Sequence, residues 1–233
     1  MSEYILECKN VTKTFGGKTA LNSVNLNLGR GRIAGLLGPN GSGKTTLIKT
    51  ICKLLVPDSG EILIDGINPG IETKSLISYL PDRGYFSPNM NTNELIGFFT
   101  DFYADFRPDT AWKMIESLGI NPSEKLKTLS KGTLEKVQLI MVMSRKAKLY
   151  LLDEPIGGVD PAARDYIINS IIQNYSEDAT VLISTHLITD VEQILDDVIF
   201  IRDGQILLHE SVDNLREREG KSVDAVFREV FRC

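Results

Sequence analysis

The sequence predicts an α/β fold with a parallel-sheet core, an antiparallel β layer and an inserted helical subdomain. The core is indicated by the apolar runs 149–153 and 180–184, which are typical of buried parallel strands. The helical subdomain is indicated by helical spacing of apolar residues within 84–146. A chain of 233 residues suits one domain with an inserted lobe. We therefore expect 1–83 and 147–233 to form the core and the β layer.

Three short segments near the N-terminus indicate the β layer. Residues 3–12 and 23–28 are predicted to be strands, and Gly16-Gly17 supplies a turn between them. Residues 61–66 end in Asp-Gly and predict another short strand. We expect these strands to pair in an antiparallel layer beside the loop that follows the run 33–37.

That loop, 38–45, fits the pattern G-x-x-x-x-G-K-[ST] of a phosphate-binding loop. The apolar run 33–37 precedes it, and apolar residues with helical spacing follow it over 45–55. The loop therefore joins a strand to a helix, which is the context that the motif requires. An ordinary glycine-rich turn is the alternative interpretation.

Each residue type in the loop has a chemical reason. Glycines let the backbone curl so that N–H groups point at phosphate oxygens, and the helix N-terminus adds a positive dipole end. Lys44 places a charge on the β- and γ-phosphates, and Thr45 offers a hydroxyl to Mg²⁺. The expected nucleotide contacts are consecutive in the chain: Gly38, Pro39, Asn40, Gly41, Ser42, Gly43, Lys44, Thr45 and Thr46.

The strand predicted at 149–153 ends in two carboxylates. At the C-terminal end of a strand Asp153 can hold Mg²⁺, directly or through water. Glu154 can take a proton from an attacking water, and such general-base help is worth roughly 10²–10⁴-fold in rate. An Asp-Glu pair after a strand is by itself more often a helix cap, but the phosphate-binding loop upstream favours catalysis.

Two further features have functional and structural interpretations. His186 follows the strand that ends at Ser184, at the sheet edge where ligands gather, although a lone histidine is usually structural. Ser130 and Gly132 precede an apolar helix at 134–143, where Ser130 can act as the N-cap and the helix N-terminus as an anion site. His209 has no such companions and is interpreted as structural.

The helical subdomain contains an aromatic stripe. Its members follow i, i+3, i+4, i+7 spacing: Leu95, Phe98, Phe99, Phe102, Tyr103 and Phe106. This periodicity favours burial in a core over a partner surface. A second helix is predicted from Pro108 to Leu118, with Gly119 as its stop. Near the C-terminus, 197–209 is predicted to be a hairpin and 222–231 a closing amphipathic helix.

Composition narrows the class of protein. The net charge of −5 argues against non-specific nucleic-acid binding. Cys8, Cys52 and Cys233 lie far apart, without metal spacing or an evident disulfide set, which fits a reducing cytoplasm. No apolar run approaches the ~18 residues of a membrane span, and the N-terminus lacks a signal-peptide pattern.

Taken together, these motifs resemble the nucleotide-binding subunit of ATP-binding-cassette (ABC) transporters, over essentially the whole chain. The resemblance implies a P-loop NTPase (RecA-like) core and a single ABC ATPase domain at 1–233. It implies that Phe15 stacks on adenine, that Asp160 lies in the D-loop Gly158-Val159-Asp160, and that His186 is the switch histidine. It also places Leu129 to Thr133 where the family has its LSGGQ stretch, which completes the site of the opposite subunit.

The resemblance further implies the partners. Two subunits, as a homodimer or a heterodimer with a second ABC subunit, hold ATP and Mg²⁺ between them. Their motion passes to an integral membrane permease, so the protein is expected on the cytoplasmic face of the membrane as a peripheral subunit. In the family, the neighbourhood of Tyr85 and Phe86 receives the permease, although buried packing explains these aromatics equally well.

Two departures from the family pattern stand out. The Q-loop reads Tyr79-Leu80-Pro81-Asp82, so a carboxylate at Asp82 replaces a neutral amide; it can bind Mg²⁺ but repels a triphosphate. The LSGGQ stretch contains Lys131, a charge that can approach phosphate, and Thr133, which is too short to copy glutamine. Both departures resemble a bacterial subgroup that serves separate export-type permeases.

The main hypothesis is therefore an ATPase subunit of an exporter. A second hypothesis, motivated by Asp82 and Lys131, is a regulatory module that binds ATP and barely hydrolyses it. A third is a soluble ABC-type ATPase that acts on DNA or ribosomes, which the acidic charge and the single cassette disfavour.

Overall fold

The computed structural model describes residues 3–157, 161–176 and 178–231. Its core is a six-stranded sheet in the order β5-β6-β7-β3-β8-β9. All neighbours are parallel except the last pair, β8 and β9. The strands are β3 (Ile33–Leu37), β5 (Ile77–Leu80), β6 (Leu149–Asp153), β7 (Thr180–Thr185), β8 (Asp197–Arg202) and β9 (Gln205–Ser211).

Strands β3, β6 and β7 are buried along their whole length, as continuous apolar runs in a parallel sheet require. The hairpin of β8 and β9 was predicted, and its turn is formed by Asp203 and Gly204, both with positive φ. The parallel-sheet core predicted from the sequence is confirmed. Strand β5 is not predicted by the patterns above, because its four residues are too few to show a period.

The antiparallel layer is a three-stranded sheet in the order β2-β1-β4. Its strands are β1 (Tyr4–Phe15), β2 (Lys18–Gly29) and β4 (Ser59–Ile64). The predicted strands 3–12 and 23–28 are too short, because polar residues on the exposed face hide the alternation near the turn. Gly16 and Gly17 form the turn with positive φ, as two-residue hairpin loops favour.

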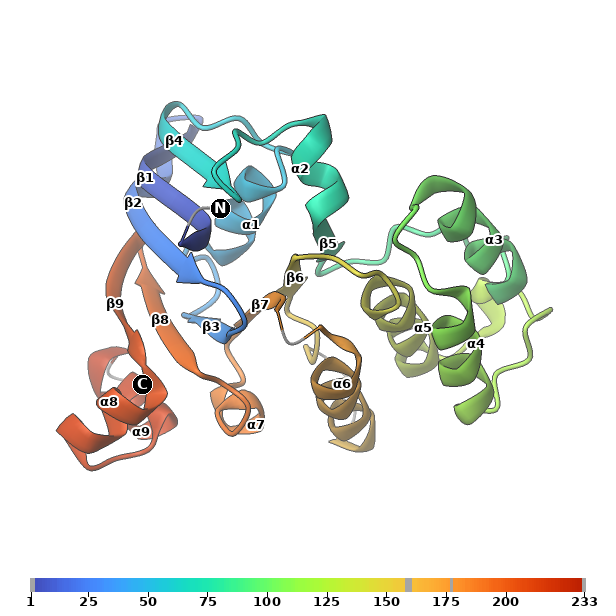
Figure 1. Ribbon diagram of the computed structural model, residues 1–233. Helices are drawn as coiled ribbons and strands as arrows, with labels where there is room; N and C mark the ends of the chain where they lie inside the picture. Colours follow the sequence, from blue (N-terminus) through green and yellow to red (C-terminus); the bar gives the residue numbers. More distant parts are fainter. Residues whose placement is uncertain (1–2, 158–160, 177, 232–233) are drawn as a thin grey trace.

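Helices cover both faces of the core sheet (Figure 1). Helix α1 (Lys44–Ile51) packs between the two sheets, and α2 (Ile71–Leu76) precedes β5. The other face packs against α6 (Pro161–Asn174), α7 (Ile188–Val191), α8 (Val212–Glu219) and α9 (Val223–Phe231). The prediction that helix α1 reaches residue 55 is wrong, because Lys53 has φ 55°, in the left-handed region.

Helices α3 (Thr92–Phe102), α4 (Pro108–Ser117) and α5 (Lys131–Met143), with a 3₁₀ turn at Leu126–Thr128, form a separate group beside the sheet (Figure 1). This group has its own apolar cluster. Leu95, Phe99 and Phe106 of the aromatic stripe are buried in it, as predicted. Phe98 and Phe102 are not: their rings stack 4.4 Å apart, and Phe102 is 70% exposed.

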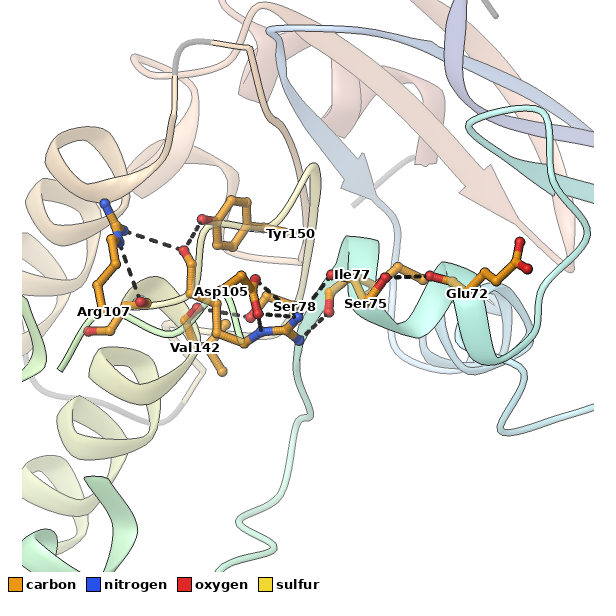
Figure 2. Close-up of polar contacts among 10 residues, drawn as sticks. Glu72, Ser75, Ile77, Ser78, Asp105, Arg107, Val142 and Tyr150 are labelled. Atoms are coloured by element: carbon orange, nitrogen blue, oxygen red, sulfur yellow. Dashed lines mark hydrogen bonds and ion pairs between the residues drawn. The ribbon is translucent and has the colours of Figure 1, made fainter. Parts of the chain in front are cut away.

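Arg145, just after α5, joins the helical group to the core. Its guanidinium donates to the carbonyls of Ser75 and Ile77 in the core and to the Asp105 carboxylate in the helical group, at 3.0 and 3.1 Å (Figure 2). The same guanidinium lies 4.0 Å from the centre of the Tyr103 ring. Arg145 is only 4% exposed and the Asp105 side chain is 25% exposed, so the arginine is shielded from solvent and its partner only partly. Within the described part of the chain, no helix has the length and apolar character to cross a bilayer.

Candidate nucleotide site

The loop between β3 and α1 can close only because its glycines lack side chains. A Cβ on Gly38 would come within 2.3 Å of the Ile201 carbonyl oxygen. Gly43, at φ 110°, forms the N-terminal boundary of α1, and a Cβ there would lie 2.7 Å from the Ala20 carbonyl oxygen. The loop therefore presses against β2 and β8 while its N–H groups stay at the start of a helix.

Lys44 lies inside the loop. Its Nζ donates to the carbonyl oxygens of Gly38 at 2.7 Å and Pro39 at 3.2 Å, and lies 3.3 Å from Oε1 of Glu154. The side chain is 5% exposed, so its charge depends on these oxygens for compensation. Lys44 and Glu154, 110 positions apart in the sequence, therefore lie side by side in the fold.

Asp153, at the end of β6, is buried and its two oxygens differ. Oδ1 accepts hydrogen bonds from Thr45 Oγ1 at 3.1 Å and Ser184 Oγ at 2.6 Å. Oδ2 is buried and accepts none from the residues that the structure describes. Burial raises the pKa of Asp153, and the hydrogen bonds from Ser184 and Thr45 oppose that rise. A buried oxygen without a partner, next to a threonine hydroxyl, suits a hard cation such as Mg²⁺.

Glu154 adopts φ 52°, which residues other than glycine rarely do. Its N–H donates to the Ser184 carbonyl oxygen at 2.9 Å, and its Oε2 lies 3.0 Å from Nδ1 of His186. The strained backbone turns the carboxylate to a position between Lys44 and His186. Such strain clusters at functional sites.

A cavity of about 520 Å³ opens over the loop. Seven of the nine loop residues expected to contact nucleotide line it: Asn40, Gly41, Ser42, Gly43, Lys44, Thr45 and Thr46. Asp82, predicted as a metal ligand, and Glu154, predicted as the base, line it as well. Five lining residues were not predicted from the sequence: Lys18, Thr19, Ala20, Asp203 and Gly204. They come from the start of β2 and from the β8–β9 turn, where the Gly204 N–H donates to the Ser42 carbonyl oxygen at 2.9 Å. The Asp203-Gly204 turn was visible in the sequence, but its approach to the loop was not.

A model of the ABC transporter family matches residues 21–157, more than half of the chain. The chain belongs to the ABC transporter family. It is 30% identical to YcbN of Bacillus subtilis (strain 168), an uncharacterized ABC transporter ATP-binding protein, over 96% of this chain and 75% of that protein. It is 31% identical to SkfE of the same organism, the SkfA peptide export ATP-binding protein, over 87% of each chain. A solved ATP-binding subunit of an ABC transporter superposes with a TM-score of 0.87 at 26% identity, over 97% of this chain and 99% of that one.

The family therefore accounts for the P-loop NTPase fold and for ATP binding, and the chain is the ATP-binding subunit of an ABC transporter. Not every predicted site residue of this ABC subunit lies in its own cavity. Phe15 is 47% exposed beside Lys13, outside the lining of the described cavity. Asp160 lies outside the described residues.

The Leu129–Thr133 stretch of the ABC subunit leads into α5 of the helical group (Figure 1). None of its residues lines the cavity. Ser130 caps α5: its Oγ accepts from the Thr133 N–H at 3.1 Å, as predicted. The Nζ of Lys131 lies 3.8 Å from Oε1 of Glu135, one helical turn further on. Gly132 follows in the first turn of the same helix.

Proposed function

We propose that this ABC subunit hydrolyses ATP and thereby drives export through a separate membrane permease. One observation supports hydrolysis above all: the Glu154 carboxylate lies 3.3 Å from Lys44 and 3.0 Å from His186, directly after Asp153. This arrangement supports Glu154 as the base, Lys44 as the phosphate-binding cation and His186 as the orienting imidazole.

The roles follow from these contacts. Lys44 neutralises the β- and γ-phosphates once it exchanges its carbonyl partners for phosphate oxygens. Glu154 accepts the proton of the attacking water, and His186 holds the Glu154 carboxylate in place through Nδ1. These assignments of Lys44, Glu154 and His186 as catalytic residues are our proposal.

Thr45 and Asp153 are the residues that would hold Mg²⁺, and the free Oδ2 of Asp153 fits this role. Asp82 lines the same cavity and is a third candidate. Among the described residues no cluster of three or more His, Cys, Asp or Glu side chains gathers as a metal site. Mg²⁺ requires only one or two protein ligands, because it keeps several waters and also binds substrate phosphates. When bound, it would neutralise charge on the β- and γ-phosphates.

Two subunits are proposed to share each nucleotide. Ser130, Lys131, Gly132 and Thr133 start a 13-residue helix outside the cavity of their own chain, so we assign them to the site of a second ABC subunit. In the same proposal, Phe15 stacks on the adenine and Asp160 lies at the interface between the two subunits. The pairing can be between two copies or with a related chain, and 84–146 is taken as the helical subdomain that carries the shared loop.

Attachment to the cytoplasmic face of the membrane is proposed through the permease. SkfE is named as a peptide export protein, and this similarity favours export over uptake.

Tyr85 and Phe86 are the two residues predicted to contact the permease. Tyr85 is exposed, whereas Phe86 packs partly on the apolar cluster of the helical group, so only Tyr85 is a surface residue.

A regulatory module with little hydrolysis is the second candidate, and Asp82 favours it. Its carboxylate lines the cavity, where it repels a triphosphate. Phosphate release by the purified chain with millimolar Mg²⁺ and ATP decides between the two. We expect steady turnover that is lost in Lys44→Ala; turnover no faster than in Lys44→Ala would refute the ATPase proposal and support the regulatory module.

A further inference from the structure

Ser184 contacts both acidic residues of the site, the carboxylate of Asp153 and the backbone N–H of Glu154, without being part of the cavity lining. It is the fifth residue of β7, is fully buried, and pairs with Asp153 of β6 in the parallel register. The sequence patterns give it no role beyond that of a strand residue.

The Ser184 hydroxyl contacts both acidic residues at once. Oγ donates to Oδ1 of Asp153 at 2.6 Å and accepts from the N–H of Glu154 at 3.2 Å. The same N–H also donates to the Ser184 carbonyl oxygen at 2.9 Å. One side chain therefore contacts the proposed metal ligand and the backbone of the proposed base.

Other buried hydroxyls on core strands of this chain bond differently. Thr180, also on β7, donates to the Gly29 carbonyl oxygen, and Ser78 on β5 donates to the Val142 carbonyl oxygen. Those contacts satisfy backbone acceptors and hold elements together. The Ser184 hydroxyl instead donates to a carboxylate, so its hydrogen bond acts on a functional group.

The consequence is an asymmetry between the Asp153 oxygens. Oδ1 has two donors, Ser184 and Thr45, whereas Oδ2 has none among the described residues. Loss of the Ser184 hydroxyl would free the carboxylate to rotate and share its donors. It would also remove one of the two acceptors that hold the Glu154 N–H in its left-handed conformation.

We propose that Ser184 is a positioning residue that presents Oδ2 of Asp153 to the cation and fixes the backbone of Glu154. This inference rests on the proposed roles of Asp153 and Glu154. Outer partners of metal ligands are typically worth about 10–100-fold in metal affinity or activity. We therefore expect Ser184 to affect the Mg²⁺-dependent part of nucleotide binding and to leave the Mg²⁺-independent part unchanged.

The test measures equilibrium binding of a non-hydrolysable ATP analogue, once with Mg²⁺ and once with EDTA. In Ser184→Ala the gain in affinity on adding Mg²⁺ should fall about 10–100-fold, with affinity in EDTA unchanged. Ser184→Thr keeps the hydroxyl and should restore the gain. Ser78→Ala is the matched control, because it removes a buried strand hydroxyl that bonds only to a backbone carbonyl.

An unchanged Mg²⁺ gain in folded Ser184→Ala, or an equal loss in Ser78→Ala, would overturn the proposal. If Ser184→Ala fails to fold, Ser184→Cys preserves the side-chain volume with a weaker donor and should show the same loss of Mg²⁺ gain. The wild type separates the two levels of inference. If Mg²⁺ does not strengthen binding of the analogue to the wild type, Asp153 has no metal role and the positioning role of Ser184 is wrong as well. If Mg²⁺ strengthens binding equally in the wild type and in Ser184→Ala, the positioning role of Ser184 is wrong and the proposed function is unaffected.

Discussion

The Lys44 ammonium and the Glu154 carboxylate form an ion pair at 3.3 Å, with side chains 5% and 18% exposed. Glu154 is thus a counter-ion of the lysine that is proposed to bind phosphate. A triphosphate has to displace this pairing, and the carboxylate that it displaces is the group proposed to activate water. The Glu154 carboxylate therefore competes with the triphosphate for Lys44 during binding. In the chemical step the same carboxylate is proposed to promote hydrolysis as the base.

Glu154→Gln should consequently change binding and turnover in opposite directions. The amide removes the competing charge, so ATP should bind several-fold more tightly, while turnover should fall by roughly 10²–10⁴-fold without the base. The tighter binding should accumulate an ATP-bound dimer, measured by size-exclusion chromatography with light scattering.

Glu210→Gln is the matched control for this substitution, since the Glu210 side chain is 17% exposed and pairs with Arg218 outside the cavity. It should leave ATP affinity and turnover within about twofold of the wild type. Normal turnover in Glu154→Gln, together with a monomer at saturating ATP, would contradict both the base and the closure of the dimer.

Lys44→Ala should weaken ATP binding strongly, because the ammonium is expected to contact the phosphates directly. Hydrogen bonds to charged groups are worth about 1.5–3 kcal/mol each, and Lys44 is expected to make more than one to the phosphates. We expect at least a ~100-fold loss of affinity by calorimetry. Lys49→Ala, on the same helix but outside the cavity lining, should bind normally. Near-normal hydrolysis in Lys44→Ala would exclude the phosphate-loop assignment.

The residues that the sequence predicts for the centre of this site lie close together for a physical reason. The loop 38–45, Asp153 and His186 each stand at the C-terminal end of a strand with a strong apolar pattern, and those ends share one sheet edge. Lys18, Thr19 and Asp203 were missed because they reach the cavity through the approach of two hairpins, which no local pattern encodes. The contact of Lys44 with Glu154 likewise depends on the left-handed backbone conformation of Glu154, which the Asp-Glu-Pro sequence does not predict.

The helical group shows the same limit from the packing side. Periodicity placed Phe98, Phe99 and Phe102 on one apolar stripe, but the stripe is wider than the surface that α4 and α5 cover. Phe99 is buried, and the two neighbours at its margin are exposed. A 3.6-residue period predicts which face of a helix is apolar. It does not predict what fraction of that face packs against other elements.

Asp82→Gln should change how nucleotide binding depends on Mg²⁺. The carboxylate lines the cavity, so its replacement by an amide removes repulsion toward the triphosphate. We expect a several-fold tighter ATP affinity in EDTA and a higher Mg²⁺ concentration for half-maximal turnover. Asp101→Asn, a similar loss of charge on α3, is the control. An unchanged Mg²⁺ requirement would remove Asp82 from the metal ligands.

Asp105→Asn should destabilise the joint between the helical group and the core. The Asp105 carboxylate pairs with the buried Arg145, and removal of one partner leaves an uncompensated charge. We expect a loss of about 3–5 kcal/mol in the free energy of unfolding, measured by chemical denaturation. Glu229→Gln breaks the exposed pair with Lys221 and should have no measurable effect. Equal effects of the two substitutions would show that the Arg145 joint is energetically no different from a surface pair.

Phe98 and Phe102 provide the last prediction, because stacked rings at the surface contribute little to folding of the isolated chain. Phe98→Ser with Phe102→Ser should leave the melting temperature and the ATPase rate of the purified subunit unchanged. If the pair contacts the permease, the double variant should co-purify with it at least ~10-fold less well, as expected when aromatic anchors are lost. Phe99→Ser, within the buried apolar cluster of the helical group, should instead unfold that group. A double variant that assembles normally would make these rings ordinary exposed aromatics and would leave the exposed Tyr85 as the docking candidate.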